Sequence, residues 1–249
     1  GTLHKPNGEL CTESYEIFCS KAWTGMVVTI KMAFISTLIG FIISVPLASL
    51  SANNLVPLPI AIPARVLLAG LRSLPSIIWA LLFAIALGFG PLPGILAMTL
   101  YTIGYLGKLQ YEAMEGIANA PLESAMAMGL THSERLVHVV IPESSNDLLS
   151  QLMFMFEYNV RHGTVLGLVG AGGIGMYTDN YINPPFAYDK AFALLIVVFV
   201  VLVIIDLLSM FARSFVTEQG DVKRPKWWTV ILPAGMAADF YKKTKQSDE

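Results

Sequence analysis

Long apolar segments with few charges constrain the fold of this chain more than any other feature. The clearest are residues 23–50 and 191–211, and the 249-residue chain as a whole is 55% hydrophobic and 14% charged. Soluble domains carry about 25% charged residues. In hydrocarbon every backbone N–H and C=O must be paired within its own segment, which a helix achieves. The sequence therefore predicts an all-α polytopic membrane protein with no separate soluble enzyme domain.

About five membrane helices are expected, because roughly 20 residues are needed to cross the hydrocarbon core. The expected spans are residues 23–50, 65–89, 95–114, 148–169 and 191–211. A stretch rich in Pro and Asn, residues 51–64, is typical of a loop. The membrane domain therefore covers residues 23–211, between an extracytoplasmic segment (1–22) and a cytoplasmic or interfacial tail (212–249).

One polar stretch, residues 123–142 (ESAMAMGLTHSERLVHVVIP), stands between apolar spans. Helix formers are frequent in residues 109–128, and Gly129 allows the backbone conformation that ends a helix and turns the chain. Thr131 or Ser133 can cap a second short helix, and the proline at the end of the stretch is expected to end it. The pattern predicts a helix–turn–helix held between two membrane spans.

The spacing of this stretch resembles the coupling loop, or EAA loop, of ABC importer permeases. The family pattern is Glu-Ala-Ala, three residues, Gly, nine residues, Ile, one residue and Leu-Pro. Here Glu123-Ser124-Ala125 is followed by three residues, Gly129, nine residues, and then Val139, Val140 and Ile141-Pro142. The resemblance implies a type I ABC importer transmembrane domain whose loop, residues 109–142, docks on a separate ATPase subunit. The residues implied in ATPase coupling are Glu123, Ser124, Ala125, Gly129, Ile141 and Pro142.

The distribution of basic residues gives an orientation, because cytoplasmic segments carry an excess of Lys and Arg. With the coupling loop in the cytoplasm, the basic residues expected inside are Arg65, Lys108, Arg135, Arg213, Lys223, Arg224, Lys226, Lys242, Lys243 and Lys245, and those outside are Lys5, Lys21 and Lys190. Five spans then place the N-terminal segment outside. Cys11 and Cys19 lie in that segment, where they either pair or stay as free thiols.

Ionisable residues interrupt the fourth expected span. Glu157 and Arg161 are four residues apart, so they share a helix face and can pair. Charges in hydrocarbon are costly unless they are paired or wetted. Two interpretations stay open. The pair fixes helix packing, or it lines a solute pathway in which Arg161 attracts an anion, Glu157 orients the arginine and Asn159 donates a hydrogen bond.

A glycine-rich stretch follows, residues 163–175 (GTVLGLVGAGGIG). It formally contains G-x-G-x-x-G, but that motif binds dinucleotides only between a strand and a helix of a βαβ unit. A membrane helix precedes it here, so the glycines instead predict close helix approach and a backbone bend. The expected hinge or gate residues are Gly170, Gly172, Gly173 and Gly175.

Three further stretches, residues 72–97, 102–117 and 156–175, look like the phosphonate permease branch of the importer family. That family usually has a carboxylate after R-S-x-P, where this chain has Ser76. Small residues often flank its Asn-x-Arg, where this chain has His162.

A kink is expected in the second span, because Pro75 removes a helix hydrogen bond. The freed carbonyls and Ser73 would then face water in the solute pathway. Arg72 is either a pathway residue or an interfacial arginine on an amphipathic stretch.

Together these features predict the permease subunit of an ATP-driven ABC importer for a phosphonate, phosphite or related oxyanion. Expected partners are a second copy, ABC ATP-binding subunits, an extracytoplasmic solute-binding protein and the lipid bilayer, but no nucleic acid. The sequence lacks a G-x-x-x-x-G-K-[ST] loop, a catalytic pair and a metal-ligand pattern, so ATP and Mg are expected on the partner ATPase. A permease for another solute, such as an amino acid, and an ion-coupled transporter stay open as alternatives.

Overall fold

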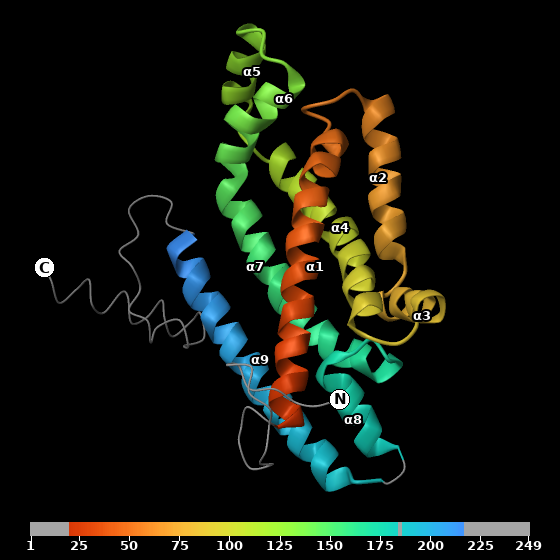
Figure 1. Ribbon diagram of the computed structural model, residues 1–249. Helices are drawn as coiled ribbons and strands as arrows, with labels where there is room; N and C mark the ends of the chain where they lie inside the picture. The colour runs from red at the N-terminus through yellow and green to blue at the C-terminus, as the bar shows by residue number, and fades with distance from the viewer. Residues whose placement is uncertain (1–19, 184–185, 217–249) are drawn as a thin grey trace, which may run out of the picture.

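The computed structural model describes residues 20–183 and 186–216, which are helical and contain no strand (Figure 1). In chain order the elements are α1 (Lys21–Ser51), α2 (Leu58–Ser73), α3 (Ser76–Leu87), α4 (Pro91–Glu115), α5 (Asn119–Ala127), α6 (His132–Arg135), the π-helix η2 (Leu136–Val140), α7 (Ile141–Leu166), the short η3 (Gly167–Val169), α8 (Gly173–Ile182) and α9 (Tyr188–Val216). The predicted all-α membrane fold is confirmed. Both cysteines and the tail from residue 217 onward lie outside the described residues.

The membrane-spanning units are α1, the α2–α3 pair, α4, α7 and α9. By length and composition alone, α1 and α9 qualify as spans, and α2 with α3 forms a third that is bent by 79°. Helices α4 and α7 have 25 and 26 residues, so they are long enough to cross at about 1.5 Å per residue. They are more polar, and they lie alongside α1 in the bundle (Figure 1).

Close approach of small residues holds α1 against α4. A Cβ atom added at Gly40 would lie 2.4 Å from the Thr102 side chain, so only glycine fits there. Nearby, the Ser36 hydroxyl donates to the Ile95 carbonyl across the same contact at 3.1 Å. Small residues and interhelical hydrogen bonds are the usual means of helix association in lipid, where burial of apolar surface provides no driving force.

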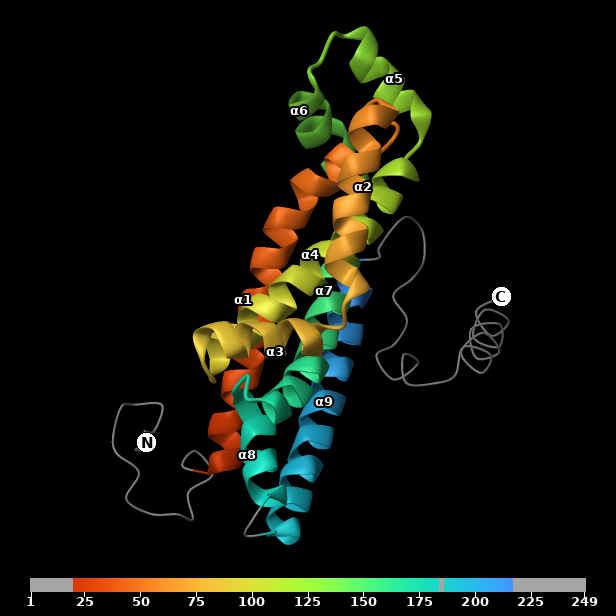
Figure 2. The ribbon, with the colours of Figure 1, turned by 90° about the vertical axis from the view of Figure 1, so that its right-hand side faces the viewer.

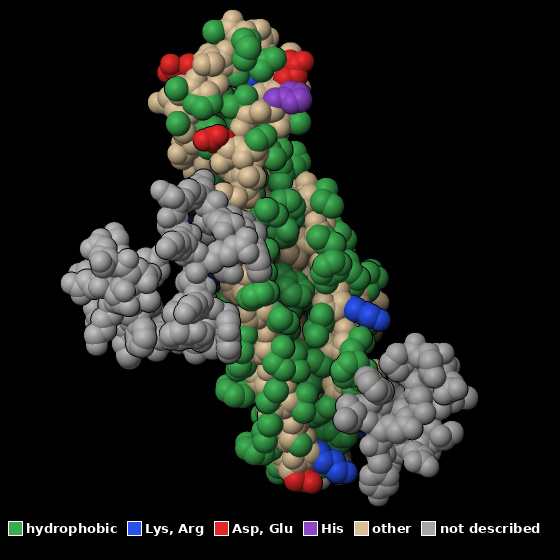
Figure 3. All heavy atoms as spheres, turned by 90° about the vertical axis from the view of Figure 1, so that its left-hand side faces the viewer, with side chains coloured by type: hydrophobic (Ala, Val, Ile, Leu, Met, Phe, Trp, Pro, Cys, Tyr) green, Lys and Arg blue, Asp and Glu red, His purple; other side chains and the backbone are tan. Residues whose placement is uncertain are grey.

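The two ends of the bundle differ. Helices α5 and α6 project at one end, whereas α8 and the start of α1 lie at the other in both views (Figures 1 and 2). On one face, hydrophobic side chains cover the length between these ends, and acidic and histidine side chains gather near α5 and α6 (Figure 3). The start of α1 thus lies opposite the predicted coupling loop, as an odd number of spans requires.

One predicted boundary was wrong, and one helix was not predicted. The loop expected over 51–64 is shorter, because α2 already begins at Leu58 with a proline in its first turn. Proline is tolerated there since the first N–H groups of a helix have no intrahelical acceptor. The ten-residue helix α8, between the fourth and fifth spans, was not predicted.

Candidate functional site

The predicted turn at Gly129 is a helix C-cap of the Schellman type. Gly129 has φ 76°, and its N–H donates to the Met126 carbonyl at 3.0 Å. The N–H of Leu130 donates to the Ala125 carbonyl at 3.2 Å, which completes the motif. Hence α5 and α6 form a compact hairpin, called here the coupling hairpin (residues 119–140).

The outer surface of the coupling hairpin is partly apolar. Glu123 and Ser124 are exposed, whereas Ala125 is buried beneath them. Met126 and Met128 are 48% and 71% exposed. Flexible methionine side chains exposed on a polar hairpin are typical of surfaces that bind another protein.

The end of the hairpin differs from the prediction. Pro142 does not end a helix: it lies in the first turn of α7, directly after the π-helix η2 (Leu136–Val140), and the chain stays helical through it. Helix α6, η2 and α7 follow one another without a break from His132 through Ile141 to Leu166. A displacement of the coupling hairpin would therefore pass directly into the α7 span.

The charges within the fourth span belong to a larger ionic cluster, formed by Glu157 and Arg161 of α7 and Asp206 and Arg213 of α9. The Arg161 guanidinium donates to Glu157 Oε1 at 3.0 Å and to both Asp206 oxygens at 3.1 Å. Arg213 donates to Glu157 Oε2 at 2.9 Å. The predicted Glu157–Arg161 contact is present, but sequence reasoning missed both partners on α9.

Asn159 does not lie with these charges. Its side chain is 1% exposed, and its amide nitrogen donates at 2.9 Å to Thr37 of α1 and to Thr102 of α4. Both N–H bonds of the amide are thus used inside the protein. The expectation that Asn159 donates to a passing solute is wrong in this structure, and Asn159 instead ties three helices together.

The predicted kink at Pro75 is present, as the 79° bend between α2 and α3. The Ser73 hydroxyl donates to the Gly70 carbonyl at 2.8 Å, and the Trp79 indole donates to the Leu71 carbonyl at 3.2 Å. Two of the groups expected to face water are therefore satisfied within the protein. Arg72 is half-buried near the same bend.

The glycine stretch forms a tight corner between α7 and α8. Gly170, Gly172 and Gly173 all have positive φ, between 74° and 81°. The Gly170 carbonyl accepts from the Gly90 N–H at 2.9 Å, which joins this corner to the α3–α4 turn. A Cβ at Gly175 would lie 2.1 Å from the Thr164 carbonyl oxygen. The predicted bend and close approach are both present.

A row of stacked rings, which sequence reasoning missed, runs between α4 and α7. We call it the aromatic ladder, and its members are Tyr101 and Tyr105 of α4 and Phe154, Tyr158 and His162 of α7. The Tyr158 and His162 rings are 4.0 Å apart. The members are four residues apart on each helix, and residues at that spacing share one helix face, so the signal was present in the sequence.

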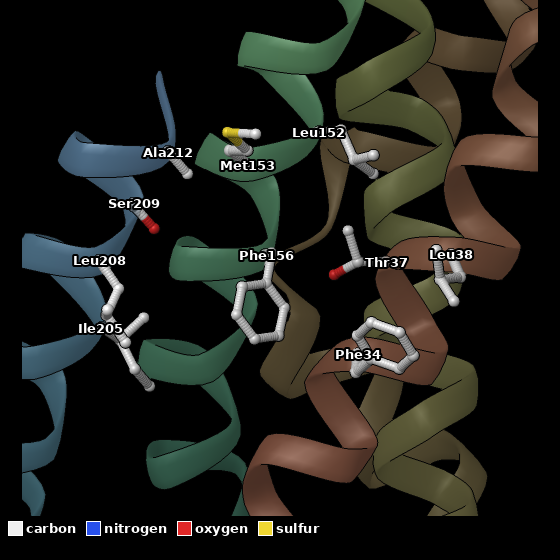
Figure 4. Close-up of a pocket in the computed structure, with 10 residues that line it drawn as sticks. All are labelled: Phe34, Thr37, Leu38, Leu152, Met153, Phe156, Ile205, Leu208, Ser209 and Ala212. Carbon is white, nitrogen blue, oxygen red and sulfur yellow. The ribbon is translucent and has the colours of Figure 1, made fainter. Parts of the chain in front are cut away.

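A cavity between α1, α7 and α9 is unsuited to a charged solute (Figure 4). Ten residues line it, and they are apolar apart from Thr37 and Ser209. The Thr37 hydroxyl already donates to the Ala33 carbonyl and accepts from Asn159. Nor does any group of three His, Cys, Asp or Glu side chains in the described ranges have the arrangement of a metal site.

The sequence also matches a known family. A family model described as "binding-protein-dependent transport system inner membrane component" matches residues 44–216, which include the coupling hairpin, the ionic cluster and the glycine corner. The chain belongs to this family. It is a transport permease subunit of an ABC importer, as the spacing of residues 123–142 predicted.

Several relatives of this chain are named as transport permeases. The chain is 37% identical over 187 residues to the phosphite transport system permease protein PtxC of Stutzerimonas stutzeri, and the match covers 75% of this chain and 68% of PtxC. It is 36% identical over 193 residues to the phosphate-import permease protein PhnE of Mycolicibacterium smegmatis, covering 77% of the permease but only 36% of PhnE. The putative phosphite transport system permease protein HtxC of Stutzerimonas stutzeri is 33% identical over 207 residues, with coverage of 83% and 71%.

Solved structures share the fold of the permease. The inward-facing methionine ABC transporter MetNI has a TM-score of 0.69 at 21% identity, over 78% of the permease and 95% of the MetNI chain. A bacterial alginate ABC transporter in complex with a pentasaccharide-bound periplasmic protein has a TM-score of 0.64 at 18% identity, over 82% and 83%. The predicted type I importer fold is therefore confirmed.

Gly129→Val is expected to leave the permease assembled but to uncouple ATP hydrolysis from transport. A β-branched residue is strained at φ 76°, by about 1–3 kcal/mol, so the turn of the coupling hairpin would change shape. In vesicles that contain the permease, its ATPase subunit and its binding protein, solute uptake should fall by about tenfold or more, with ATP hydrolysis retained. Gly116→Val is the matched control, because Gly116 has an ordinary φ of −77°. Normal uptake by Gly129→Val would contradict the expected role of the turn.

The cap of α6 should weaken in acid. The Glu134 carboxylate accepts from the Thr131 N–H and hydroxyl, both at 2.8 Å, and these hydrogen bonds lower the pKa of Glu134 below its ordinary value of 4.5. The contribution of the Glu134 carboxylate to the stability of the cap is therefore complete above pH 4.5, and it is lost as pH falls through the lower pKa of Glu134 in the folded protein. Protection of the amides at residues 131–135 against exchange should fall as pH drops below 4.5 and through the lower folded pKa of Glu134. Glu134→Gln, which can still cap, should remove that pH dependence, and an unchanged acid response in this variant would contradict the assignment.

Proposed function

We propose that the permease is the membrane subunit of an ATP-driven importer for a small oxyanion of phosphorus, such as phosphite, a phosphonate or phosphate. The observation that carries this proposal is the agreement of three relatives at 33–37% identity, each of which covers three quarters or more of the permease. Their names specify phosphite or phosphate. The range matched by the family model, residues 44–216, includes the aromatic ladder and the ionic cluster.

The coupling hairpin is proposed to dock in the cytoplasm on a separate ATP-binding subunit, which holds ATP and Mg. The exposed Met126 and Met128, together with Glu123, offer apolar contact and charge on one compact surface. The unbroken run from α6 into α7 provides a rigid path from that surface into the membrane. Closure of the ATPase subunits would move α7, and with it the ionic cluster and the aromatic ladder.

A second copy and an extracytoplasmic solute-binding protein complete the proposed assembly. Large apolar side chains are exposed on α3 and α9 and in the turn after α3, including Ile85 (84%), Phe199 (68%) and Phe89 (80%). Lipid would cover part of this surface, and a second copy the rest, with the solute pathway between the two copies. The binding protein would dock at the end of the bundle that carries α8, opposite the coupling hairpin.

Arg161 remains the proposed charged contact of this pathway. Its side chain is 50% exposed, and a single guanidinium nitrogen, Nη2, makes the contacts with both Glu157 and Asp206. A planar guanidinium can bind two oxygens of a phosphonate at once. In the pathway this contact must be weak, because the solute has to leave, and the two neighbouring carboxylates provide that weakening. Arg72, Ser73 and the bend at Pro75 are proposed to bound the pathway beside α3.

Transport selectivity tests the proposed function. Vesicles with the permease, its ATPase subunit and its binding protein should accumulate phosphite, methylphosphonate or phosphate. An amino acid is the second candidate solute, since the arginine ABC transporter permease protein ArtQ of Haemophilus influenzae is 28% identical over 179 residues. ATP-dependent accumulation of arginine, with none of the phosphorus oxyanions, would overturn the proposal.

A further inference from the structure

The aromatic ladder carries three tyrosine hydroxyls and an imidazole, which the ionic cluster does not involve. Its residues are half-buried, apart from the more exposed Phe154. They lie on a different face of α7 from the apolar cavity, because Phe156 and Tyr158 are two residues apart and a helix turns about 100° per residue. The ladder therefore has surroundings of its own, between α4, α7 and the start of α3.

Some hydroxyl protons of the ladder are not used in hydrogen bonds within the described part of the protein. The Tyr158 hydroxyl donates to the Tyr101 hydroxyl at 3.1 Å, so the proton of Tyr101 itself remains available. Tyr105 makes ring contacts at 6.0–6.3 Å, but its hydroxyl has no hydrogen-bond partner among the described residues. At least two neutral O–H donors are thus presented along one helix face.

His162 adds a third donor when Ser76 donates to its Nδ1. The Ser76 hydroxyl and His162 Nδ1 are 2.9 Å apart, and Ser76 is only 3% exposed. Ser76 already lies at the first turn of α3. When its hydroxyl donates to Nδ1, the neutral imidazole carries its proton on Nε2. Ser76 and His162 are also the two positions where the sequence departs from the phosphonate permease pattern, and the structure brings them together.

Half-buried hydroxyl and imidazole groups within a membrane bundle need water or a solute as partner. Hydrocarbon offers no hydrogen bonds, so polar residues at membrane depth face a wet cavity or one another. Within the ladder, only Tyr158 and Tyr101 share a hydrogen bond. A row of three spare donors is therefore better explained by a wetted passage than by contact with lipid.

We propose that the aromatic ladder is the surface along which the transported oxyanion passes, with its oxygens accepting from Tyr101, Tyr105 and His162 in turn. This inference rests on the proposed function and names the groups that contact the solute. Ser76 is a positioning residue that holds the Nε2–H of His162 toward the passage. Neutral donors suit a passage, because they replace hydration of the anion without the strong attraction that a bare cation would exert.

The ionic cluster supports this division of roles. Its two carboxylates and two guanidiniums are mutually paired and carry no net formal charge. Arg161 therefore orients an anion only weakly, and most contacts to the oxyanion must come from neutral donors. His162 follows Arg161 directly on α7, about 100° further round the helix, and it faces Tyr101 of α4 rather than α9.

The double variant Tyr101→Phe with Tyr105→Phe tests the inference. It removes two hydroxyls, one of which accepts from Tyr158, and leaves both rings in the stack. In vesicles with the ATPase subunit and the loaded binding protein, phosphite uptake should fall by about tenfold or more, as expected for losing hydrogen bonds to a charged group. ATP hydrolysis should continue, so the ATP consumed per phosphite imported should rise by a similar factor. Tyr181→Phe, which removes a hydroxyl from α8, is the matched control.

Two further measurements keep the outcome decisive. Ser76→Ala should lower uptake less than the double variant does, because His162 keeps its ring but loses its fixed proton position. Wild-type uptake of phosphite by the double variant, at an unchanged ATP ratio, would overturn the inference while leaving the proposed function intact. Loss of assembly in the single variant Tyr105→Phe would assign the ladder to packing and overturn it as well. Failure of the wild-type permease to import any phosphorus oxyanion would contradict the proposed function instead.

Discussion

Gly175→Ala is expected to destabilise the permease more than any other substitution considered. Its new methyl group would lie 2.1 Å from the Thr164 carbonyl oxygen and 2.8 Å from the Gly167 Cα. Both neighbours are backbone atoms that cannot rotate away, so α8 must separate from α7. Overpacking typically costs about 1–3 kcal/mol. Because these contacts are with fixed backbone, we expect Gly175→Ala to lower the free energy of unfolding by about 3 kcal/mol or more, out of a total of about 5–15 kcal/mol. The measurement is the monodisperse fraction and thermal midpoint in detergent.

Gly70→Ala is the matched control for this variant. Gly70 lies within α2, and a Cβ there has no neighbour within 4 Å. Replacing glycine by alanine in a helix contributes up to about 1 kcal/mol, so this variant should fold as well as the wild type or slightly better. Equal behaviour of Gly70→Ala and Gly175→Ala would show that the corner between α7 and α8 is more open than the structure indicates.

Arg161→Ala should be the most damaging single change in the ionic cluster. Glu157 keeps Arg213 at 2.9 Å, but Asp206 loses the guanidinium that both of its oxygens contact at 3.1 Å. Breaking a fully buried pair costs about 3–5 kcal/mol. Arg161 and Asp206 are 50% and 39% exposed, so a cost of about 1–3 kcal/mol is expected after discounting for solvent. Thermal midpoints of purified variants measure it.

The companion change that should restore assembly is Asp206→Asn, since it removes the unpaired carboxylate. Glu157 does not need such a change, because Arg213 of α9 still donates to it at 2.9 Å. Lys108→Ala is the control, because it breaks an exposed pair with Glu112 (3.3 Å) that is worth less than about 1 kcal/mol.

Transport by the restored double variant then decides the role of the arginine. Assembly without uptake, while ATP hydrolysis stimulated by the binding protein persists, would place Arg161 in the pathway. Uptake at the wild-type rate would show that its role is structural only.

Local features of the fold were predictable because they depend on neighbouring residues. The helix–turn–helix around Gly129 follows from a left-handed glycine and a capping threonine, and the bend at Pro75 follows from a missing N–H. Long, nearly uncharged apolar stretches likewise predicted the first and last spans, α1 and α9. The continuation of α7 through Pro142 was missed because proline at a first turn and proline after a helix look alike in a sequence.

The partners of the polar residues were not predictable, because they come from distant parts of the chain. Asn159 bonds Thr37 across 122 positions, and Arg161 meets Asp206 across 45. Periodicity shows that such residues share a helix face but not which helix that face meets. The aromatic ladder differs: its spacing of four on both α4 and α7 was visible, and attention to rings as well as charges would have found it.

The central claim is that the coupling hairpin links ATP hydrolysis on a partner subunit to import of a phosphorus oxyanion. The most direct measurement records labelled phosphite accumulated and ATP hydrolysed in the same vesicles, with the permease, its ATPase subunit and its binding protein. We predict accumulation that requires both ATP and the binding protein, and that Gly129→Val hydrolyses ATP but accumulates little. Accumulation without ATP, or driven by an ion gradient alone, would contradict the account.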